Sequence, residues 1–530
     1  MNTQRVYLST TIPYVNARPH LGFALELVQA DVLARHHRLA GDQVRFQTGT
    51  DDNSLKNVLA AGAEGISTGE LVDRNATAFA ALREPLALSF DDFIRTGSDP
   101  RHLPGVERLW QACAASGDLY LKHYQGLYCV GCEQFYKPAE LRDGLCPEHG
   151  TEPQRVAEEN WFFRLSRYAD QLYDLISSGR LRIEPAARRN EVLGFIAGGL
   201  EDFSASRSTA RARGWGIPVP GDPSQVIYVW WDALGNYVSA LGFGTPGADY
   251  RRWWTGADRR VHLVGKGVLR FHAVYWPAIL LSAGEPLPTD ILVHDYLTIS
   301  GNKISKSGGV ADDTADPVAL VERYGTDAVR WWLLREVPRV GDADFTAARL
   351  VARANADLAN DLGNLVSRVV TLVHRYRQGI VPSVATRAED PPQAHEPRSG
   401  DRPREAEPDR LRLAGRRLAA ACDQAPERVA AALAAFDFRA ATAAIWELVE
   451  EANRHVELTE PWRLARAEKN GDAGAEGLLD ASLALLWRIC AQLGRELAPF
   501  LPDLAARVRA ACDPTAGRLP PLEPVFPRIR

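Results

Sequence analysis

The chain lacks the long apolar run of a membrane protein and the leader of an exported one. No stretch of its 530 residues stays apolar over the length needed to span a bilayer. No basic region followed by an apolar core opens the sequence, so a cytoplasmic location is expected. With 46% hydrophobic and 24% charged residues, the composition is typical of a soluble globular protein, and the length predicts several domains.

Cysteine and net charge are also scarce. Of the seven cysteines, Cys129, Cys132 and Cys146 lie close together and the other four are scattered, which does not resemble a disulfide framework. The formal net charge of −5 indicates no global attraction to nucleic acid. Any surface that binds nucleic acid must therefore be a local patch.

A strand-to-helix turn near the N-terminus is the first candidate site. The β-branched run Val6–Thr10 leads into PYVNARPHLGF, and apolar residues then recur at helical spacing from Leu21 to Leu39. His20 and Gly22 stand where a helix start presents backbone N–H groups to an anion. His20 can donate to phosphate, and Gly22 lets a flat ligand lie against the backbone. An ordinary turn with a surface histidine fits the same residues.

Alternating strands and helices over residues 1–115 predict an α/β fold with a doubly wound parallel sheet. A second strand, Gln43–Thr48, ends in GTDD, whose carboxylates are well placed to line a crevice at the strand ends. The α/β pattern returns from Gln225. Further strands are predicted over Val261–Val264 and Ile291–Ile299.

The intervening insertion carries two close pairs of metal-binding residues. CVGC supplies Cys129 and Cys132, and CPEH supplies Cys146 and His149 after a short loop. Three thiolates and one imidazole at this spacing predict a tetrahedral zinc knuckle, and four protein ligands leave no open position, so the zinc is expected to be structural. Two unrelated surface pairs are the alternative, which the repeated spacing makes less favourable.

A glycine- and serine-rich loop, SGNKISKSGG, follows the last predicted strand and carries Lys303 and Lys306. Two ammonium groups on a mobile loop suit a polyphosphate whose charge grows in a transition state. A flexible basic surface loop fits these residues equally well, so both interpretations stay open at this point.

Beyond about Ala347 the chain is rich in Ala, Leu and Arg and shows no convincing strand, which predicts a separate α-helical domain. Its one irregular stretch, roughly Val384–Asp409, is dense in Pro and charged residues and poor in apolar ones. That composition predicts a long disordered connection between two helices.

Seven motifs taken together resemble one enzyme family. PYVNARPHLGF, GTDD, the zinc-knuckle pattern, LEDFSASR, YVWWDALGNY, HLVGKG and GNKISKS occur in the order found in the methionyl-tRNA synthetases, which are class I aminoacyl-tRNA synthetases. HLGF resembles the HIGH signature of that class and KISKS its KMSKS signature. The resemblance implies a Rossmann-type catalytic domain in two halves and an inserted zinc-knuckle connective domain, followed by an all-α helical-bundle anticodon-binding domain. The implied boundaries are 1–115 and 225–300 for the two halves, 116–224 for the insertion, 301–346 for the KMSKS-loop and stem-contact region, and 347–530 for the helical domain.

The resemblance implies ATP-dependent ligation of L-methionine to a tRNA with a CAU anticodon through methionyl-adenylate, with Mg²⁺ and one structural Zn²⁺. The implied catalytic residues are His20, Lys303, Lys306 and Arg207. The implied ATP-binding residues are His20, Gly22, Glu26, Gly265, Lys303 and Lys306. The implied methionine-binding residues are Ile12, Tyr14, Asp51, Trp230, Ala233, Leu234, Tyr237, Val268 and His272. The implied anticodon readers are Asn364 and Arg368 in NLVSR and Trp462 in TEPW, and the implied zinc ligands are Cys129, Cys132, Cys146 and His149.

The chemistry of these residues agrees with the implied roles. Apolar and aromatic walls suit a flexible thioether, and hydrogen-bonding side chains with an aromatic platform suit unpaired bases. Trp230 and Tyr237 also suit plain core packing, and Trp462 also suits packing between helices.

Three departures from the family pattern fall at the ATP end. The second histidine of HIGH is Phe23, which cannot donate to a phosphate; GTDEHG reads GTDDNS, and the GKD carboxylate expected near the ribose is Gly267. Losing one such donor can cost roughly 2–4 kcal/mol in the transition state.

Because of these departures, the ligase is interpreted as a divergent or secondary copy, and two alternative functions stay open. One is an amino-acid-activating enzyme of specialised metabolism, and the other is a tRNA-binding protein with weak or no catalysis. The chain also ends after the helical domain, without the dimer-forming C-terminal domain of some family members, so a monomer is expected.

Overall fold

The computed structural model describes residues 3–131, 134–148, 150–299, 301–303, 315–383, 407–521 and 523–530. The chain forms two compact units. The first comprises Met1–Arg323 and Pro338–Phe345, and the second comprises Tyr324–Val337 and Thr346–Arg530.

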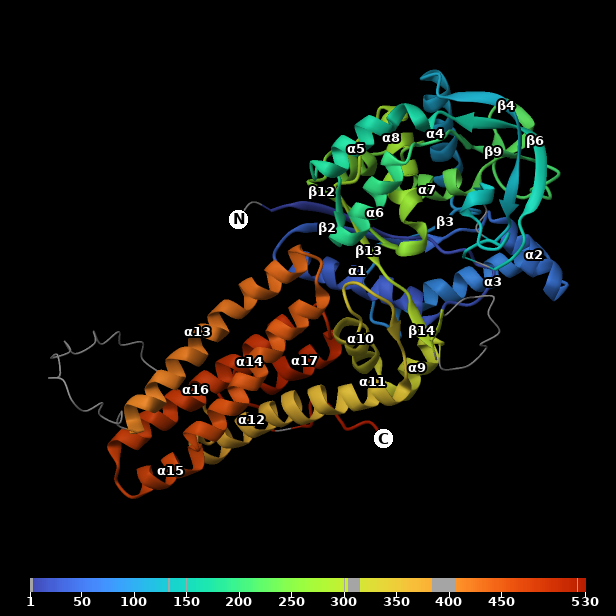
Figure 1. Ribbon diagram of the computed structural model, residues 1–530. Helices are drawn as coiled ribbons and strands as arrows, with labels where there is room; N and C mark the ends of the chain where they lie inside the picture. The colour runs from blue at the N-terminus through green and yellow to red at the C-terminus, as the bar shows by residue number, and fades with distance from the viewer. Residues whose placement is uncertain are drawn as a thin grey trace. The chain divides into compact units, whose positions relative to one another are not determined.

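The first unit is built on a six-stranded sheet in the order β3-β2-β1-β12-β13-β7, and every neighbouring pair runs parallel (Figure 1). The central strand β1 pairs with β2 on one side and β12 on the other, so the strand order changes direction between β1 and β12. Ligands of parallel α/β sheets bind outside the carboxyl ends of the strands at such a point. The strands are β1 (Arg5–Thr10), β2 (Gln43–Thr50), β3 (Asp92–Arg95), β7 (Arg182–Glu184), β12 (Arg259–Gly265) and β13 (Asp290–His294).

Helix α1 (Leu21–Leu39) packs on β1, β2 and β12 and is buried without interruption from Phe23 to Ala34. The strand β1 is likewise buried from Val6 to Thr10, as expected for a strand covered on both faces. The other helices along this part of the chain are α2 (Leu55–Glu64), α3 (Thr68–Ala80), α4 (His102–Ala115), α5 (Ala169–Ser177), α6 (Ala186–Ala197), α7 (Val229–Ser239), α8 (Trp276–Ala283) and α9 (Pro317–Tyr324).

The single strand predicted over Ile291–Ile299 is wrong, because the chain leaves the parallel sheet after His294. β14 (Leu297–Ile299) belongs to a different sheet, with β15 (Asn302–Lys303) and β16 (Ala343–Asp344). At the break, the backbone N–H of Tyr296 donates to Asp342 Oδ1 over 2.9 Å, which replaces a ladder bond with a side-chain bond. The break directs residues 294–297 toward the strand ends.

Two antiparallel sheets occupy the region between α4 and α7. The larger has the order β5-β4-β6-β8, and its long pair β4 and β6 joins Leu119 to Phe163 in register. The smaller has the order β10-β11-β9. The strands are β4 (Leu119–Cys129), β5 (Gln134–Tyr136), β6 (Gln154–Phe163), β8 (Phe203–Ser204), β9 (Ser206–Ser208), β10 (Pro218–Val219) and β11 (Asp222–Ile227).

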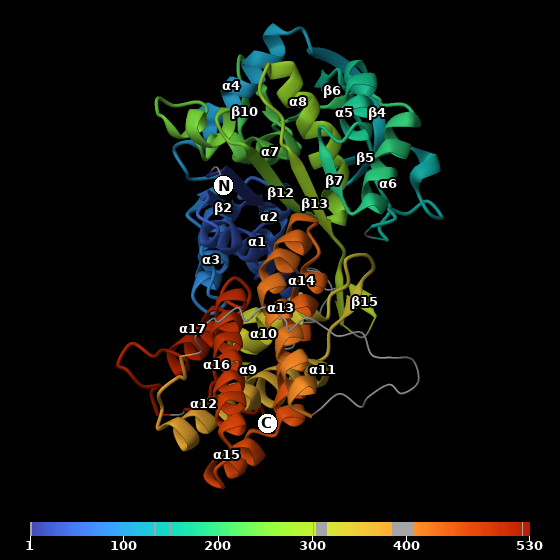
Figure 2. The ribbon, with the colours of Figure 1, turned by 90° about the vertical axis from the view of Figure 1, so that its left-hand side faces the viewer.

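The second unit consists of helices and their connections, with no strand among its described residues. Helices α13, α14 and α16 pack side by side (Figure 2). α10 belongs to this unit because the buried Arg330 donates through Nε to the carbonyl of Phe500 over 2.7 Å, and because Trp331 packs on Trp446. The helices are α10 (Thr326–Arg335), α11 (Ala347–Arg353), a π-helical stretch (Ala354–Gly363), α12 (Asn364–Arg377), α13 (Glu407–Ala434), α14 (Phe438–Thr459), α15 (Pro461–Lys469), α16 (Ala473–Glu496) and α17 (Pro502–Ala511).

The predicted α/β class with a parallel sheet and a helical C-terminal region is confirmed. Of the predicted irregular stretch, residues 384–406 lie outside the described residues, and α13 begins at Glu407. The division of the chain into five regions stays a prediction. Within the described part of the chain, the helices are too short or too polar to cross a membrane.

Candidate active site

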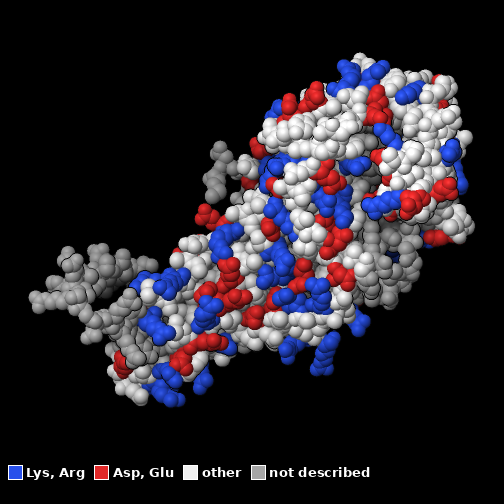
Figure 3. Space-filling view, in the orientation of Figure 1, with Lys and Arg blue, Asp and Glu red and all other residues white. Residues whose placement is uncertain are grey.

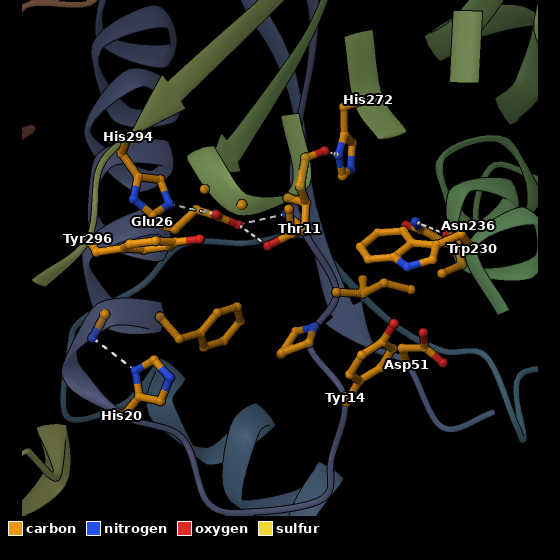
Figure 4. Close-up of a pocket in the computed structure, with 18 of the residues that line it drawn as sticks. Thr11, Tyr14, His20, Glu26, Asp51, Trp230, Asn236, His272, His294 and Tyr296 are labelled. Atoms are coloured by element: carbon orange, nitrogen blue, oxygen red, sulfur yellow. Dashed lines mark hydrogen bonds and ion pairs between the residues drawn. The ribbon is translucent and has the colours of Figure 1, made fainter. Parts of the chain in front are cut away.

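A cavity of about 330 Å³ opens at the carboxyl ends of β1, β2, β12 and β13, where the strand order changes direction (Figure 4). Residues directly beyond or at the strand ends line it. Thr11 and Ile12 follow β1, Asp51 follows β2, and Gly265 ends β12. The parallel pairing therefore brings sequence-distant segments to one place.

His20 and Gly22 lie at this cavity, at the start of α1. His20 Nδ1 accepts a hydrogen bond from the backbone N–H of Gly22 over 3.1 Å, so the histidine caps its own helix. A Cβ at Gly22 would lie 3.0 Å from the imidazole, so the close approach of this ring favours glycine here. Because Nδ1 accepts, the neutral ring carries its proton on Nε2 and has its donor there.

Phe23 also lines the cavity and is 7% exposed. Its ring meets Phe79 of α3 edge to face, with the centroids 5.1 Å apart. The residue that replaces the second histidine of the HIGH signature is therefore part of the packing between α1 and α3.

The apolar wall of the cavity contains every residue that the sequence suggested for a thioether side chain. Trp230 stands edge-on to Tyr14 at 6.2 Å between centroids, and Phe271 stacks on it at 3.9 Å. The stack holds the indole in one orientation at the cavity wall. The predicted residues that line this cavity are Ile12, Tyr14, Trp230, Ala233, Leu234, Tyr237, Val268 and His272.

Tyr237 and His272 form a neutral hydrogen-bonded pair. His272 Nδ1 donates to the carbonyl of Val268 over 2.8 Å, so its Nε2 accepts from the Tyr237 hydroxyl, also over 2.8 Å. Burial lowers the pKa of His272 to about 4, which keeps the imidazole neutral near pH 7. This part of the wall therefore presents no charge to a ligand.

Asp51 is fully buried at the same wall, beside Tyr14 (Figure 4). Its Oδ1 accepts from the backbone N–H of Asn53 over 3.0 Å, and the Asn53 amide donates to Asp232 over 2.8 Å. Asn53, which stands where the family pattern has histidine, thus links two buried carboxylates. A buried carboxylate at a cavity wall suits an ammonium group.

Glu26 lies at the opposite end of the cavity and is held from two sides. One oxygen accepts from the Thr11 backbone N–H and hydroxyl over 2.7 and 2.6 Å, and the other accepts from His294 Nε2 over 2.8 Å. His294 Nδ1 faces the carbonyl of Asp295 over 2.9 Å. Both ring nitrogens of His294 therefore meet acceptors, which requires the imidazolium form. The raised pKa of His294 agrees, since burial would lower it and the bonded Glu26 carboxylate more than offsets that effect.

Several lining residues were missed from the sequence. Thr11 could have been found, since it directly follows a predicted strand end. His294, Asp295 and Tyr296 were hidden because the predicted strand ran past them to Ile299. The missed lining residues that carry polar side chains are Thr11, Asn16, Lys56, Asn236, His294, Asp295 and Tyr296.

Arg207 does not line this cavity. It lies in the strand β9 at a second cavity of about 550 Å³, with its guanidinium 4.2 Å from the Tyr228 ring centre. Its Nη1 donates to the carbonyls of Ser204 and Ser206 over 3.0 and 2.7 Å. No sequence pattern indicates that backbone carbonyls and aromatic rings would hold this side chain.

Two of the predicted zinc ligands can be placed. Cys129 and Cys146 are each 1% exposed and share a small apolar cluster with Tyr136. Cys132 and His149 lie outside the described residues. Among the residues that are described, no group of three or more His, Cys, Asp or Glu side chains could hold a metal ion.

The lysine-rich loop is only partly described. The backbone of Lys303 forms the end of β15, while Lys306 lies outside the described residues. The phosphate-binding role of this loop stays a prediction.

In the helical unit, Asn364 and Arg368 lie one turn apart on the exposed face of α12, and Trp462, the second residue of α15, is 45% exposed. Packing between helices, the alternative for Trp462, does not fit that exposure. On the face drawn in Figure 3, basic and acidic side chains are interspersed over this unit.

A family profile described as tRNA synthetases class I (M) matches residues 6–158 and 136–370, which is more than half of the chain. The matched residues include the strands β1, β2, β12 and β13, whose carboxyl ends carry the cavity. The protein is therefore a class I tRNA synthetase by fold and sequence.

Full-length relatives give the family. The chain is 40% identical to the methionine–tRNA ligase of Brucella suis biovar 1, over 100% of this chain and 98% of the relative. It is 39% identical to that of Caldanaerobacter subterraneus subsp. tengcongensis, over 94% of this chain and 72% of the relative. The chain belongs to the methionine–tRNA ligase family.

A solved structure of this family has the same fold. The crystal structure of Mycobacterium tuberculosis methionyl-tRNA synthetase bound by methionyl-adenylate superposes with a TM-score of 0.86 at 36% identity, and the match covers 99% of this chain and 100% of that one.

Proposed function

We propose that the protein ligates L-methionine to a tRNA with a CAU anticodon, using ATP and passing through methionyl-adenylate. The observation that carries this function is one cavity with two chemically different ends. A buried carboxylate and an apolar aromatic wall, at Asp51 and Trp230, fit the ammonium and thioether of methionine. His20 and Glu26 stand where the nucleotide would lie.

In the first step, a carboxylate oxygen of methionine attacks the α-phosphorus of ATP. The new O–P bond forms while the bond from that phosphorus to the bridging oxygen breaks, and pyrophosphate leaves with the electron pair. The nucleophile is already ionised, so no protein base is needed, and catalysis consists of positioning and charge stabilisation. In the second step, a hydroxyl oxygen of the terminal adenosine of tRNA attacks the carbonyl carbon, and the bond from that carbon to the phosphate oxygen breaks. AMP leaves with the electron pair, and the hydroxyl proton passes to the departing phosphate.

The proposed division of labour follows from the position of each residue. Asp51 binds the ammonium, the apolar wall holds the thioether, His20 and the Gly22 backbone contact the phosphates, and Glu26 and Gly265 lie against the nucleoside. Lys303 and Lys306 are proposed to stabilise the departing pyrophosphate. Mg²⁺, when bound with ATP, neutralises phosphate charge. Arg207 is proposed as a positioning residue that holds the Ser204–Ser206 backbone from the neighbouring cavity.

A structural Zn²⁺ is proposed to be held by Cys129, Cys132, Cys146 and His149, where it would crosslink the two ends of the knuckle. The burial of Cys129 and Cys146 in one small cluster supports this donor set, because thiolate ligands of structural zinc are withdrawn from water. Asn364, Arg368 and Trp462 are proposed to read the anticodon, which their exposure supports. A monomeric, cytoplasmic enzyme completes the proposal.

Two assays test the function. We expect methionine-dependent exchange of labelled pyrophosphate into ATP, with leucine as the control amino acid, and charging of a CAU-anticodon tRNA. Exchange without charging would favour an amino-acid-activating enzyme of another pathway. Binding of tRNA without exchange would leave a tRNA-binding protein.

A further inference from the structure

The second unit holds a cavity of about 450 Å³ between α13 and α14, which lie side by side (Figure 2). The cavity forms where small residues of α13 face a larger side chain of α14. Ala414 lines it, and a Cβ placed on Gly415 would meet nothing closer than Cε1 of His455, at 3.9 Å. The volume lies in the range of about 300–1,000 Å³ that is typical of small-molecule sites.

Arginine side chains give this cavity a positive charge. Arg410 and Arg417 line it from α13, about two helical turns apart, and Arg454 lines it from α14. Glu451 is the one carboxylate among the described lining residues, and it pairs with Arg454 over 2.6 Å. Three guanidinium groups and one carboxylate leave the lining with a net charge of +2, which favours an anionic ligand.

His455 of α14 brings a hydrogen-bonding group to the same cavity. The residue is 5% exposed, and its Nδ1 is buried without a hydrogen-bond partner among the described residues. Burial lowers the pKa of His455 to about 4, so the imidazole is neutral near pH 7. A buried polar atom without a partner costs free energy, which a ligand that bonds to this atom recovers.

Two neighbouring hydroxyl groups fix the tautomer of His455. The Thr459 hydroxyl donates to the carbonyl of His455 over 2.8 Å, so its oxygen must accept from the Ser482 hydroxyl, 3.3 Å away. Ser482 has then used its one proton and accepts from His455 Nε2 over 3.4 Å. Nε2 therefore carries the ring proton, and Nδ1 is an acceptor that requires an N–H or O–H group on the ligand.

These groups together match a nucleotide. The arginines suit a phosphate, Leu413, Leu418 and Leu458 suit the faces of a flat base, and His455 Nδ1 suits an amino group on that base. We propose that the cavity between α13 and α14 binds AMP, with the phosphate at the arginines and the 6-amino group donating to His455 Nδ1. AMP is the nucleotide that the second step of the proposed reaction releases, so the choice of this occupant rests on the proposed function.

Equilibrium dialysis with labelled AMP tests the site without turnover. An excess of a methionyl-adenylate analogue, with a sulfamoyl group in place of the phosphate, keeps AMP out of the candidate active site. We expect about one AMP to bind per chain under this condition, and added salt to weaken the binding because phosphate contacts are screened. Adenosine and inorganic phosphate should each bind more weakly than AMP. AMP that binds only when the analogue is omitted would overturn the inference.

The base contact is tested from the ligand and from the protein. Purine riboside 5′-monophosphate lacks only the 6-amino group and should bind about twofold to tenfold more weakly than AMP, as for the loss of one hydrogen bond. That difference should disappear in His455→Phe, which keeps a ring but has no acceptor. A difference that persists in a folded His455→Phe variant, or that is absent from the wild-type protein, would overturn the contact. The wild-type comparison needs no variant.

The phosphate contact is tested with two neighbouring arginines of α13. Arg417→Gln should weaken AMP binding by about twofold to fivefold, as for the loss of an exposed ion pair. Arg416→Gln is the matched control, because both arginines are exposed and Arg416 does not line the cavity. Equal effects of the two changes would show that AMP responds only to general positive charge, and would overturn the site.

The outcomes separate this inference from the proposed function. Absence of methionine-dependent exchange would overturn the function, whereas AMP binding that depends on His455 and Arg417 would still support the site. Exchange with no AMP bound beside the analogue would overturn the inference alone. Loss of bound AMP when tRNA is added would make a nucleotide of the tRNA the occupant and overturn the assignment to free AMP.

Discussion

Phe23 illustrates how a single residue can look like a lost function and prove to be part of the packing. Compared with the HIGH signature, Phe23 replaces a histidine that could donate to a phosphate. In the structure Phe23 is buried against Phe79, and His20, the proposed phosphate donor at this end of the cavity, caps α1.

Phe23→His should therefore lower stability without raising the adenylation rate. An imidazole packed against Phe79 leaves a polar group poorly satisfied, which costs about 1–3 kcal/mol. Thermal unfolding and pyrophosphate exchange measure the two effects. Phe23→Leu is the control, since it stays apolar and should lose less stability. A faster Phe23→His enzyme with an unchanged melting temperature would show that the missing donor limits the rate.

His294 predicts a pH dependence at the residue scale. Its pKa in the folded protein is raised above the unfolded value of about 6.5 because burial, which lowers it, is more than offset by the Glu26 carboxylate. The ion pair therefore contributes stability that is fully present below about pH 6.5 and is lost as pH rises through the folded pKa.

His294→Gln tests this sign. The wild-type protein should exceed the variant in melting temperature most at pH 6, and the difference should shrink toward pH 9. His123→Gln is the control, because the His123 side chain is 86% exposed and its replacement should leave the pH profile alone. A difference that grows with pH would contradict the imidazolium assignment.

At the scale of elements, close packing of helices depends on single glycines. Gly105 of α4 lies against Ser239 of α7, where a Cβ would stand 2.5 Å from the serine Cβ and 3.0 Å from its Cα. Neither atom can move without shifting α7, which carries Trp230 into the cavity wall.

Gly105→Ala should therefore destabilise the protein by about 1–3 kcal/mol through overpacking, as measured by denaturant unfolding. Gly62→Ala is the matched control. Gly62 lies inside the helix α2 and a Cβ there meets nothing within 4 Å, so the change should stabilise by roughly 0.5–1 kcal/mol. Equal effects of the two changes would mean that α4 and α7 separate easily.

The elements also show which features local sequence predicts and which it does not. The strand β1 could be predicted from its β-branched run, and the helix α1 from apolar residues that recur at helical spacing. The break between β13 and β14 could not, because it depends on Asp342, which bonds to Tyr296 from 46 residues further along the chain. The candidate site divides in the same way. Residues within contiguous motifs, such as Asp51 and Trp230, were identified, while His294 and Tyr296 depend on that long-range bond.

For the whole molecule, the two units predict a separation of activities. Trp462→Ala in the helical unit should weaken tRNA charging while leaving pyrophosphate exchange and melting temperature near wild type, because the side chain is 45% exposed. Trp446→Ala is the control for mere structural damage. Trp446 is 2% exposed and packs on Trp331, so its loss should cost about 3–5 kcal/mol in stability. Equal loss of exchange and charging in Trp462→Ala would show that Trp462 is structural.

The order of strands in the parallel sheet has a consequence for the protein during its synthesis. β1 is a central strand, yet one of its two partners, β12, begins at Arg259. At roughly 5–20 residues per second, the ribosome needs on the order of 10–50 seconds to extend the chain from β1 to β12. For that time the nascent chain carries a strand with one open hydrogen-bonding edge, which is a template for aggregation. Translation speed across the insertion and chaperone occupancy of the N-terminal strand should therefore limit the yield of folded enzyme.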